Sequence, residues 1–194
     1  MNKVKVLIEG YAKINKDGTW EATSTTTLIE HGNIKIIMDP GCDRKLLNEN
    51  LASNNLGLED IVWVFLSHRH LDNTVLIGIF PNAKVIDDEL FQDGPHGELH
   101  KTFIPGTDIE IVKTPGHSPR HGSLLVNTSD GVVAVAGDVF WFKDGEEQTQ
   151  DINKPGDFAD GNFEDLKKSR QLLLDKADWI IPGHGKMFKK TFKS

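Results

Sequence analysis

Two histidines and an aspartate directly follow an apolar run in the middle of the chain. The segment Ser67-His68-Arg69-His70-Leu71-Asp72-Asn73 comes after residues 61–66, a run short enough to be one strand buried on both faces. Imidazoles and carboxylates are good metal ligands, and this spacing puts three of them at the mouth of a rigid element. The segment therefore predicts a metal site, although a histidine taken alone is more often an ordinary surface residue.

Metal-binding residue types follow apolar runs at further places in the chain. Residues 109–112, 132–136 and 179–181 each lead through a short turn to one such residue, and these are His117, Asp138 and His184. Open α/β sheets bind ligands where strands end at their carboxyl edge. We therefore expect the four runs to converge on one site.

Composition limits the class of protein. With 194 residues and 38% hydrophobic content, the chain is expected to form one globular domain spanning residues 1–194. A net charge of −7 disfavours nucleic acid as a partner without excluding it. The single cysteine, Cys42, cannot form an internal disulfide and fits a reducing compartment. No apolar run is long enough for a signal peptide or a membrane span, so a cytoplasmic location and no membrane partner are expected.

Periodicity and capping residues predict the elements that position these side chains. In the first half we expect strands at 4–8, 23–30, 34–38, 61–66 and 84–86, a turn at 16–18, a helix capped by Asp43 that runs to about 54, and a helix at 72–79. In the second half we expect strands at 109–112, 123–127, 132–136 and 179–181, and a helix capped by Asn162 that runs to 177. Residues 87–105 and 140–161 are predicted to be long irregular loops that wall a substrate pocket.

Several other residues could belong to the site. Asp39 ends a predicted strand and is expected to hold the neighbouring loop by hydrogen bonds, not to bind metal. Trp141 and Phe142 could wall a pocket or cover the core. His96 and His100 fall in a predicted loop, where exposure without a role is at least as common as substrate contact. Cys42 could be a reactive thiol, but a small packed side chain is the more common role.

The full set of motifs resembles the metallo-β-lactamase superfamily. The matching motifs are His68-Arg69-His70-Leu71-Asp72, Thr114-Pro115-Gly116-His117, Gly137-Asp138 and Pro182-Gly183-His184-Gly185, and Asp39 matches the superfamily's first, non-ligand aspartate. Residues 134–140 and 168–170 are most similar to small members of the metallo-β-lactamase domain-containing type. The resemblance implies an α/β fold, a four-layer αββα sandwich of two mixed sheets with the metal centre at one edge.

The resemblance also implies a ligand set. His68, His70 and His117 would bind a first metal, Asp138 would bridge to a second, and Asp72 and His184 would complete the second site. The superfamily pattern continues Asp-His, whereas here Asn73 follows Asp72, and an amide oxygen is a poorer zinc ligand than imidazole. We therefore expect one or two zinc ions, with Asn73 at most a weak ligand and iron or manganese an alternative at the second site. His121 matches a histidine often seen in relatives, for which a structural or supporting role is expected.

These ligands predict a hydrolase that uses a metal-bound hydroxide. Three neutral imidazoles leave the ion its full charge and an open position, which lowers the pKa of bound water to about 7. Asp72, Asp138 and His184 are the candidate catalytic residues, because they can orient the hydroxide, accept its proton or protonate a leaving group. The expected substrate is a small ester, lactone, thioester or β-lactam or a short phosphodiester. A ribonuclease of the same fold and a non-catalytic metal-binding protein, disabled at Asn73, are the alternatives.

Overall fold

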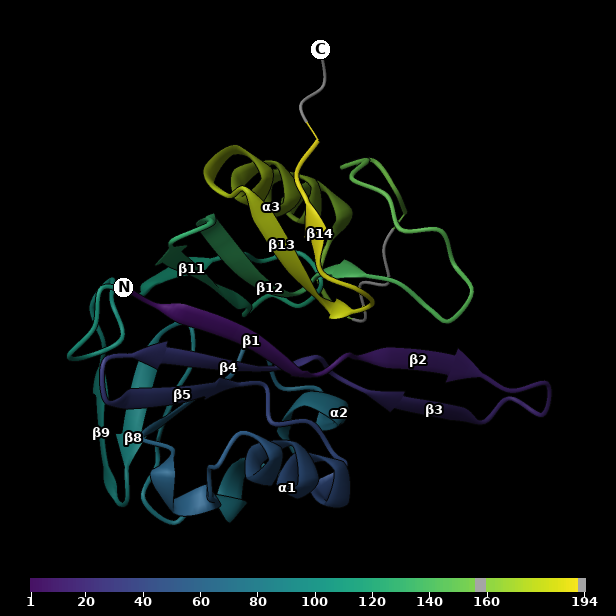
Figure 1. Ribbon diagram of the computed structural model, residues 1–194. Coiled ribbons are helices and arrows are strands. Elements are labelled where there is room, and N and C mark those ends of the chain that lie inside the picture. The colour runs from purple at the N-terminus through teal and green to yellow at the C-terminus, as the bar shows by residue number, and fades with distance from the viewer. Residues whose placement is uncertain (156–159, 192–194) are drawn as a thin grey trace.

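Two mixed sheets form the centre of the molecule (Figure 1). The computed structural model describes residues 1–155 and 160–191. Within these residues the larger sheet has seven strands, which are in spatial order β1 (Lys3–Ile8), β4 (Thr26–His31), β5 (Ile34–Met38), β6 (Trp63–Phe65), β7 (Lys84–Ile86), β8 (Leu90–Asp93) and β9 (His96–Leu99). The smaller sheet of the described chain has five, which are β10 (Glu110–Lys113), β11 (Gly122–Thr128), β12 (Gly131–Trp141), β13 (Trp179–His184) and β14 (Phe188–Lys189).

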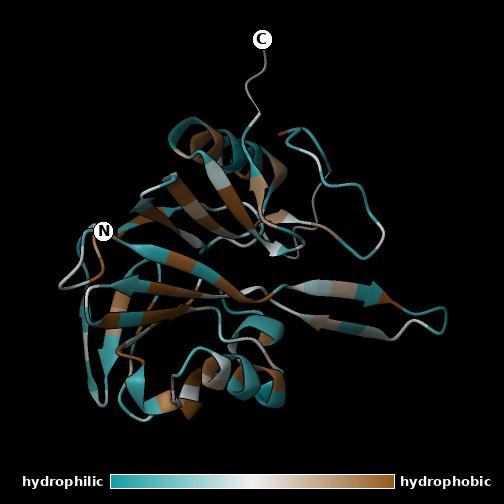
Figure 2. Cartoon of the chain, in the orientation of Figure 1, coloured by the Kyte–Doolittle hydropathy of each residue, from teal (hydrophilic) through white to brown (hydrophobic). Residues whose placement is uncertain are grey.

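The main core lies between the two sheets. It brings Met38 and Phe65 of the larger sheet together with Leu124 and Val135 of the smaller one, all of them buried. Figure 2 shows the hydrophobic residues concentrated on strands of both sheets, among them β4, β5 and β13. The two sheets therefore pack face to face, because each buries its inner apolar face against the other.

Two amphipathic helices cover the outer faces of the sheets. Helix α1 (Arg44–Ser53) buries Leu47 and Leu51 against the larger sheet, and the Asp43 side chain caps it by accepting the Leu46 amide at 2.9 Å. Helix α3 (Phe163–Lys176) buries Leu166 and Leu173 against the smaller sheet. The layers therefore run helix, sheet, sheet, helix, which confirms the predicted αββα sandwich.

The predicted helix at 72–79 is wrong in its extent. Within this segment only α2 (Leu71–Thr74) is α-helical, and a single 3-10 turn follows at Ile77–Ile79. Another 3-10 turn, Leu58–Asp60, lies earlier in the chain, just before β6. Val75, Ile77 and Ile79 are β-branched and Gly78 has a low helix propensity, so the segment has little intrinsic tendency to continue as a regular helix. The chain instead leaves the metal-ligand loop after one turn.

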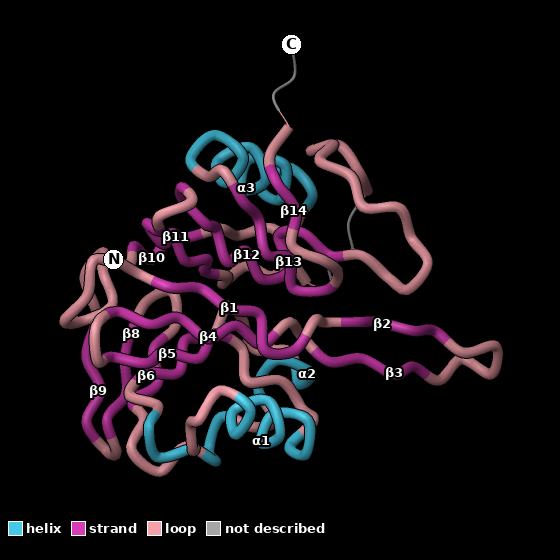
Figure 3. Tube along the Cα trace, viewed as in Figure 1, coloured by secondary structure: helices cyan, strands magenta, loops and turns pink. Residues whose placement is uncertain are grey.

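An unpredicted hairpin projects from the edge of the sandwich (Figure 3). It consists of β2 (Tyr11–Ile14) and β3 (Trp20–Thr23), which pair antiparallel around the predicted turn at 16–18. The strand predicted at 23–30 is therefore divided, since β3 ends at Thr23 and β4 begins at Thr26.

The two predicted long loops also contain strands. Residues 87–105 hold the antiparallel hairpin β8–β9, and β12 continues through residue 140 to Trp141. Part of the second loop, residues 156–159, lies outside the described residues. In the part of the chain that is described, no helix is both long and apolar enough to cross a membrane.

Candidate metal centre

Three histidines and one aspartate converge at one edge of the sandwich. His70 Nδ1 lies 2.9 Å from His68 Nε2 and 3.0 Å from His117 Nε2. Asp138 Oδ2 lies 3.3 Å from His117 Nε2 and 3.7 Å from His68 Nε2. The four ligand atoms all lie within 4.8 Å of one another, so they can share one ion.

The ends of strands supply these side chains. His68 and His70 follow β6, His117 follows β10, and His184 is the last residue of β13. Asp138 differs from the prediction, because it lies inside β12 at a bulge beside Gly137 and not after the strand. Gly137 has a φ of 54°, and a Cβ atom there would lie 2.7 Å from the Ser67 Cβ, so the bulge requires glycine.

Asp72 and His184 stand beside this group as a second cluster. His184 Nε2 lies 3.2 Å from Asp72 Oδ2 and 3.9 Å from Asp138 Oδ2. The Nδ1 atom of His184 must carry a proton, because it donates to the Tyr11 carbonyl oxygen at 3.0 Å. That bond leaves Nε2, the atom that faces the two carboxylates, as the nitrogen able to bind a metal.

The donor atoms fit a metal ion by their spacing, by the neutral state of His68 and by a carboxylate oxygen that has no hydrogen-bond partner among the described residues. A tetrahedral ion with bonds of 2.0–2.1 Å separates its nitrogen ligands by about 3.3 Å. His70 Nδ1 lies 2.9 and 3.0 Å from the other two imidazole nitrogens, which is close to that separation. Burial, and then the neighbouring histidines, hold the pKa of His68 well below its usual value, so the ring is neutral as a ligand must be. Asp138 Oδ1 is buried with no hydrogen-bond partner among the described residues.

The pKa values of the second cluster shift in opposite directions. Burial opposes ionisation of Asp72, but the close contact and charge interaction with the His184 ring outweigh burial and lower the pKa of this carboxyl. Burial likewise opposes the charged form of His184, but Asp138 and Asp72 outweigh it and raise the pKa of the ring. In the metal-free protein this cluster therefore favours a carboxylate facing a protonated imidazole.

Asn73 is fully buried on α2 and adjoins the second cluster. Its Nδ2 donates to Asp72 Oδ1 at 3.3 Å, and its backbone amide donates to the His70 carbonyl. Its Oδ1 has no hydrogen-bond partner among the described residues. The side chain therefore reaches a ligand carboxylate and leaves one oxygen unpaired.

The buried ring of His121 holds the backbone of Asp138 in place by a hydrogen bond. Its Nε2 accepts the backbone amide of Asp138 at 3.2 Å, so its Nδ1 must donate to Thr114 Oγ1 at 2.9 Å. Thr114 then donates to Ser123, and Ser123 donates to the Ala136 carbonyl. Burial lowers the pKa of His121 to about 3, so this chain of hydrogen bonds keeps one direction at neutral pH.

The remaining candidates have identifiable contacts. The Asp39 carboxyl group accepts the Ser67 amide at 2.8 Å through Oδ1, which confirms the predicted loop-holding role. Trp141 packs against the ring of His184 with centroids 5.5 Å apart, whereas Phe142 is buried in the core beside α3. The ring nitrogens of His100 contact the backbone carbonyl oxygens of Asp87 and Lys101. Cys42 donates to the Ala22 carbonyl at 3.2 Å.

The β2–β3 hairpin makes an unpredicted contribution to the site. The Tyr11 carbonyl orients His184, and the hairpin lines the cavity next to it. The predicted turn at 16–18, flanked by alternating apolar residues, was the signal that could have located this hairpin.

Curated relatives are similar over nearly the whole chain. The metallo-β-lactamase domain-containing protein 1 of Xenopus laevis is 30% identical over 97% of this chain and 82% of its own length. The Mus musculus protein of the same name is 32% identical over 97% of this chain and 76% of its own length. No family model matches the sequence.

Solved structures share the fold at low identity. A metallo-β-lactamase-like protein of Thermotoga maritima has a TM-score of 0.73 and 20% identity, covering 97% of this chain and 99% of that one. A dizinc quorum-quenching lactonase has a TM-score of 0.63 and 12% identity, and the match covers 91% of this chain and 82% of the lactonase. A protein in a di-iron-bound form has a TM-score of 0.61 and 18% identity, and the match covers 86% of this chain and 89% of that protein. The relatives and the convergent His and Asp side chains together show that the chain belongs to the metallo-β-lactamase superfamily.

Proposed function

We propose that the protein hydrolyses an ester, lactone, thioester, β-lactam or phosphodiester bond of a small molecule at a site of one or two metal ions. The observation that carries the proposal is the convergence of four ligand atoms from His68, His70, His117 and Asp138 within 4.8 Å. The dizinc lactonase among the structural neighbours supports this class of reaction. We also infer that residues 1–194 act as one domain, because the main core takes residues from both sheets.

His68, His70, His117 and Asp138 would hold the first ion, and Asp72 and His184 would hold a second together with Asp138. An ion bound there supplies Lewis acidity and lowers the pKa of the water it holds to about 7. Zinc suits the imidazole-rich first site. At the second site iron or manganese becomes competitive, since Asn73 stands where a further imidazole would favour zinc. The di-iron form of a structural neighbour is consistent with that choice.

Carboxylates of the chain would orient the attacking water and accept its proton. Asp138 Oδ2 lies between the histidine group and His184, so it can orient a water molecule and accept its proton. Asp72, whose pKa is lowered, stays ionised beside it at neutral pH. With the second site empty, His184 would be protonated on the side facing these carboxylates and could donate that proton to a leaving group.

The metal content of the purified protein tests the proposal. Protein prepared without chelator should contain at least one zinc, iron or manganese ion per chain by elemental analysis. It should hydrolyse at least one ester, lactone, thioester, β-lactam, phosphodiester or RNA substrate. Chelation should abolish this activity and added metal should restore it.

Matched histidine variants separate the site from the rest of the surface. His117→Ala should lose the bound metal and slow hydrolysis by about 100-fold or more, as expected when a first-sphere group is removed. His96→Ala should retain both properties, because His96 lies exposed on β9 away from the group. A protein with no bound metal, or with metal and no activity toward any substrate, would support the non-catalytic alternative.

A further inference from the structure

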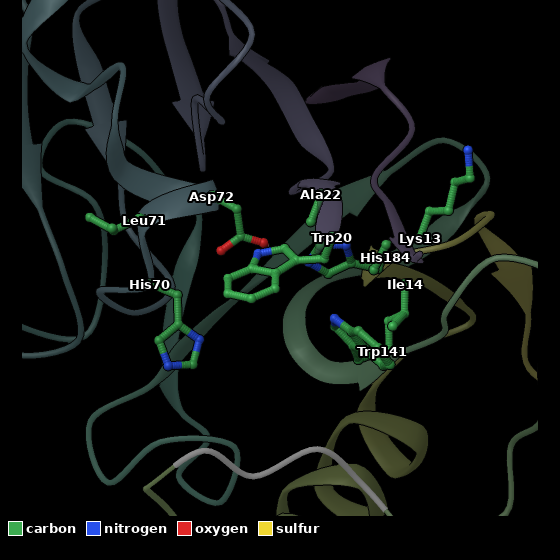
Figure 4. A pocket seen from close by; sticks show the side chains of 10 residues that line it. Lys13, Ile14, Trp20, Ala22, His70, Leu71, Asp72, Trp141 and His184 are labelled. Atoms are coloured by element: carbon green, nitrogen blue, oxygen red, sulfur yellow. The ribbon is translucent and has the colours of Figure 1, made fainter. Parts of the chain in front are cut away.

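A groove of about 500 Å³ begins at the metal centre and continues along the β2–β3 hairpin (Figure 4). Its inner end is formed by His70, Asp72 and His184. We call it the hairpin groove, and its other lining residues are Ala12, Lys13, Ile14, Trp20, Ala22, Leu71 and Trp141. A volume of this size fits a small-molecule ligand.

One face of the hairpin gives the groove its apolar character. Ala12 pairs with Ala22, and Ile14 pairs with Trp20, so these four side chains share one face of the two-stranded ribbon. All four line the groove. Because the face continues outward from His184, a molecule held at the metal centre would extend along it.

Large apolar side chains on this face have no role in the core. Ile14 is 69% exposed and Trp20 is 74% exposed, and Leu71 at the same groove is 76% exposed. None of the three belongs to the hydrophobic core clusters of the described chain. Contiguous exposed apolar surface around a concave site is typical of a ligand-binding surface.

The cations near the metal centre are balanced by carboxylates. Lys13, in the groove, has Glu21 4.0 Å away. Across the metal centre, Arg120 lies 3.2 Å from Asp88 and 2.9 Å from Glu89, and both Arg120 and Arg69 contact Asp87. Two guanidinium groups therefore face three carboxylates, so this side offers little excess positive charge to a phosphate.

We propose that the hairpin groove binds the unbranched acyl chain of an uncharged carboxylic ester, thioester or lactone. This inference rests on the proposed hydrolytic function and narrows its substrate from the wider set given above. The acyl carbon would lie at the His70 end of the groove, with its chain against Ile14 and Trp20. Phosphodiesters and RNA are disfavoured, since the groove is apolar and the neighbouring cations are already paired.

The reaction needs no co-reactant other than water. The water oxygen forms a bond to the acyl carbon, and the bond from that carbon to the alcohol oxygen or thiol sulfur breaks. One water proton passes to Asp138 and then to the departing oxygen or sulfur. The products are a carboxylic acid and an alcohol or thiol, or a hydroxy acid when a lactone opens.

A series of p-nitrophenyl esters from acetate to hexanoate tests the groove in the metal-loaded protein. Burial of each methylene gives up to about a fourfold gain, so kcat/KM should rise about two- to fourfold per methylene. Ile14→Ser and Trp20→Ala should each reduce this increment. Leu99→Ser is the matched control, because Leu99 is 72% exposed on β9 far from the groove, and it should retain the wild-type increment.

The outcomes separate this inference from the proposed function. Hydrolysis of the esters with no dependence on chain length, or an increment unchanged in Ile14→Ser and Trp20→Ala, would overturn the inference and leave the hydrolase intact. Faster hydrolysis of bis-p-nitrophenyl phosphate than of every ester would also overturn it. If the metal-loaded protein hydrolyses nothing, titration calorimetry with acetate, butyrate, hexanoate and octanoate still tests whether the groove binds an acyl chain. Affinity that rises with length and falls in Ile14→Ser supports the groove, and equal affinities refute it.

Discussion

The buried carboxyl of Asp39 predicts an unusual pH dependence for the stability of the metal-free protein. Asp39 is 1% exposed, has a φ of 50° and accepts the Ser67 amide. Burial raises its pKa to about 8, with Asp138 and Asp72 adding to the rise and the Ser67 hydrogen bond opposing it. The folded protein therefore keeps a proton on Asp39 at neutral pH.

The sign of the effect follows from proton binding in the two states. Between pH 3.8, the ordinary pKa of an aspartate, and about pH 8, the folded chain holds a proton on Asp39 that the unfolded chain has released. Stability should therefore fall as pH rises through this window, by up to about 1.4 kcal/mol per pH unit. Asp39→Asn keeps an oxygen acceptor for Ser67 and removes the titration. The free energy of unfolding of the variant, relative to wild type, should increase by about 3 kcal/mol between pH 5 and 7.5.

Urea denaturation in EDTA at several pH values measures this difference. Asp87→Asn is the control, because the pKa of Asp87 is lowered and its titration lies below the window. Its difference from wild type should stay constant from pH 5 to 7.5. Bound metal should also shrink the Asp39→Asn effect, since nearby positive charge lowers the pKa of Asp39. A constant difference for Asp39→Asn across the window would refute the assignment of a protonated Asp39.

Other substitutions test the site more directly. Asn73→His should raise the metal content by up to one ion per chain in elemental analysis, and an unchanged content would mean that residue 73 does not face the ions. His121→Phe removes the acceptor for the Asp138 amide, so metal affinity should fall about 10- to 100-fold in a competition titration with a chelator; equal affinity would contradict the supporting role. Gly116→Ala should destabilise the fold by about 3 kcal/mol in urea denaturation, because φ is 140° and the new Cβ would lie 2.2 Å from the Leu166 amide nitrogen. A loss below about 1 kcal/mol would show that the backbone relaxes there.

The convergence of the metal-binding side chains could be predicted because each one is tied to a strong local signal. His68, His117 and His184 each follow or end an apolar strand, and the strands bring them to one edge. The two main helices could be located for a similar reason, since Asp43 and Asn162 cap them with side-chain hydrogen bonds. Local capping and apolar periodicity agree with the tertiary packing in these elements.

The two hairpins were not predicted because their large side chains do not follow a core-facing pattern, although the turn at 16–18 was a usable local signal for β2–β3. Strand β9 is exposed along its whole length, so it has no apolar alternation to recognise. In β2–β3 the apolar Ile14 and Trp20 face a groove and not the core. The unpaired Asn73 oxygen likewise depends on burial that no local pattern reveals.

The hydrogen bond from His184 to the Tyr11 carbonyl has a thermodynamic consequence. It joins the base of a projecting ribbon to an imidazole at the reaction centre. Any molecule that immobilises the ribbon also restricts that ring, and an ion that restricts the ring also immobilises the ribbon. By whatever factor an ion at this ring changes the affinity of a molecule on the ribbon, linkage requires that molecule to change the affinity of the ion by the same factor.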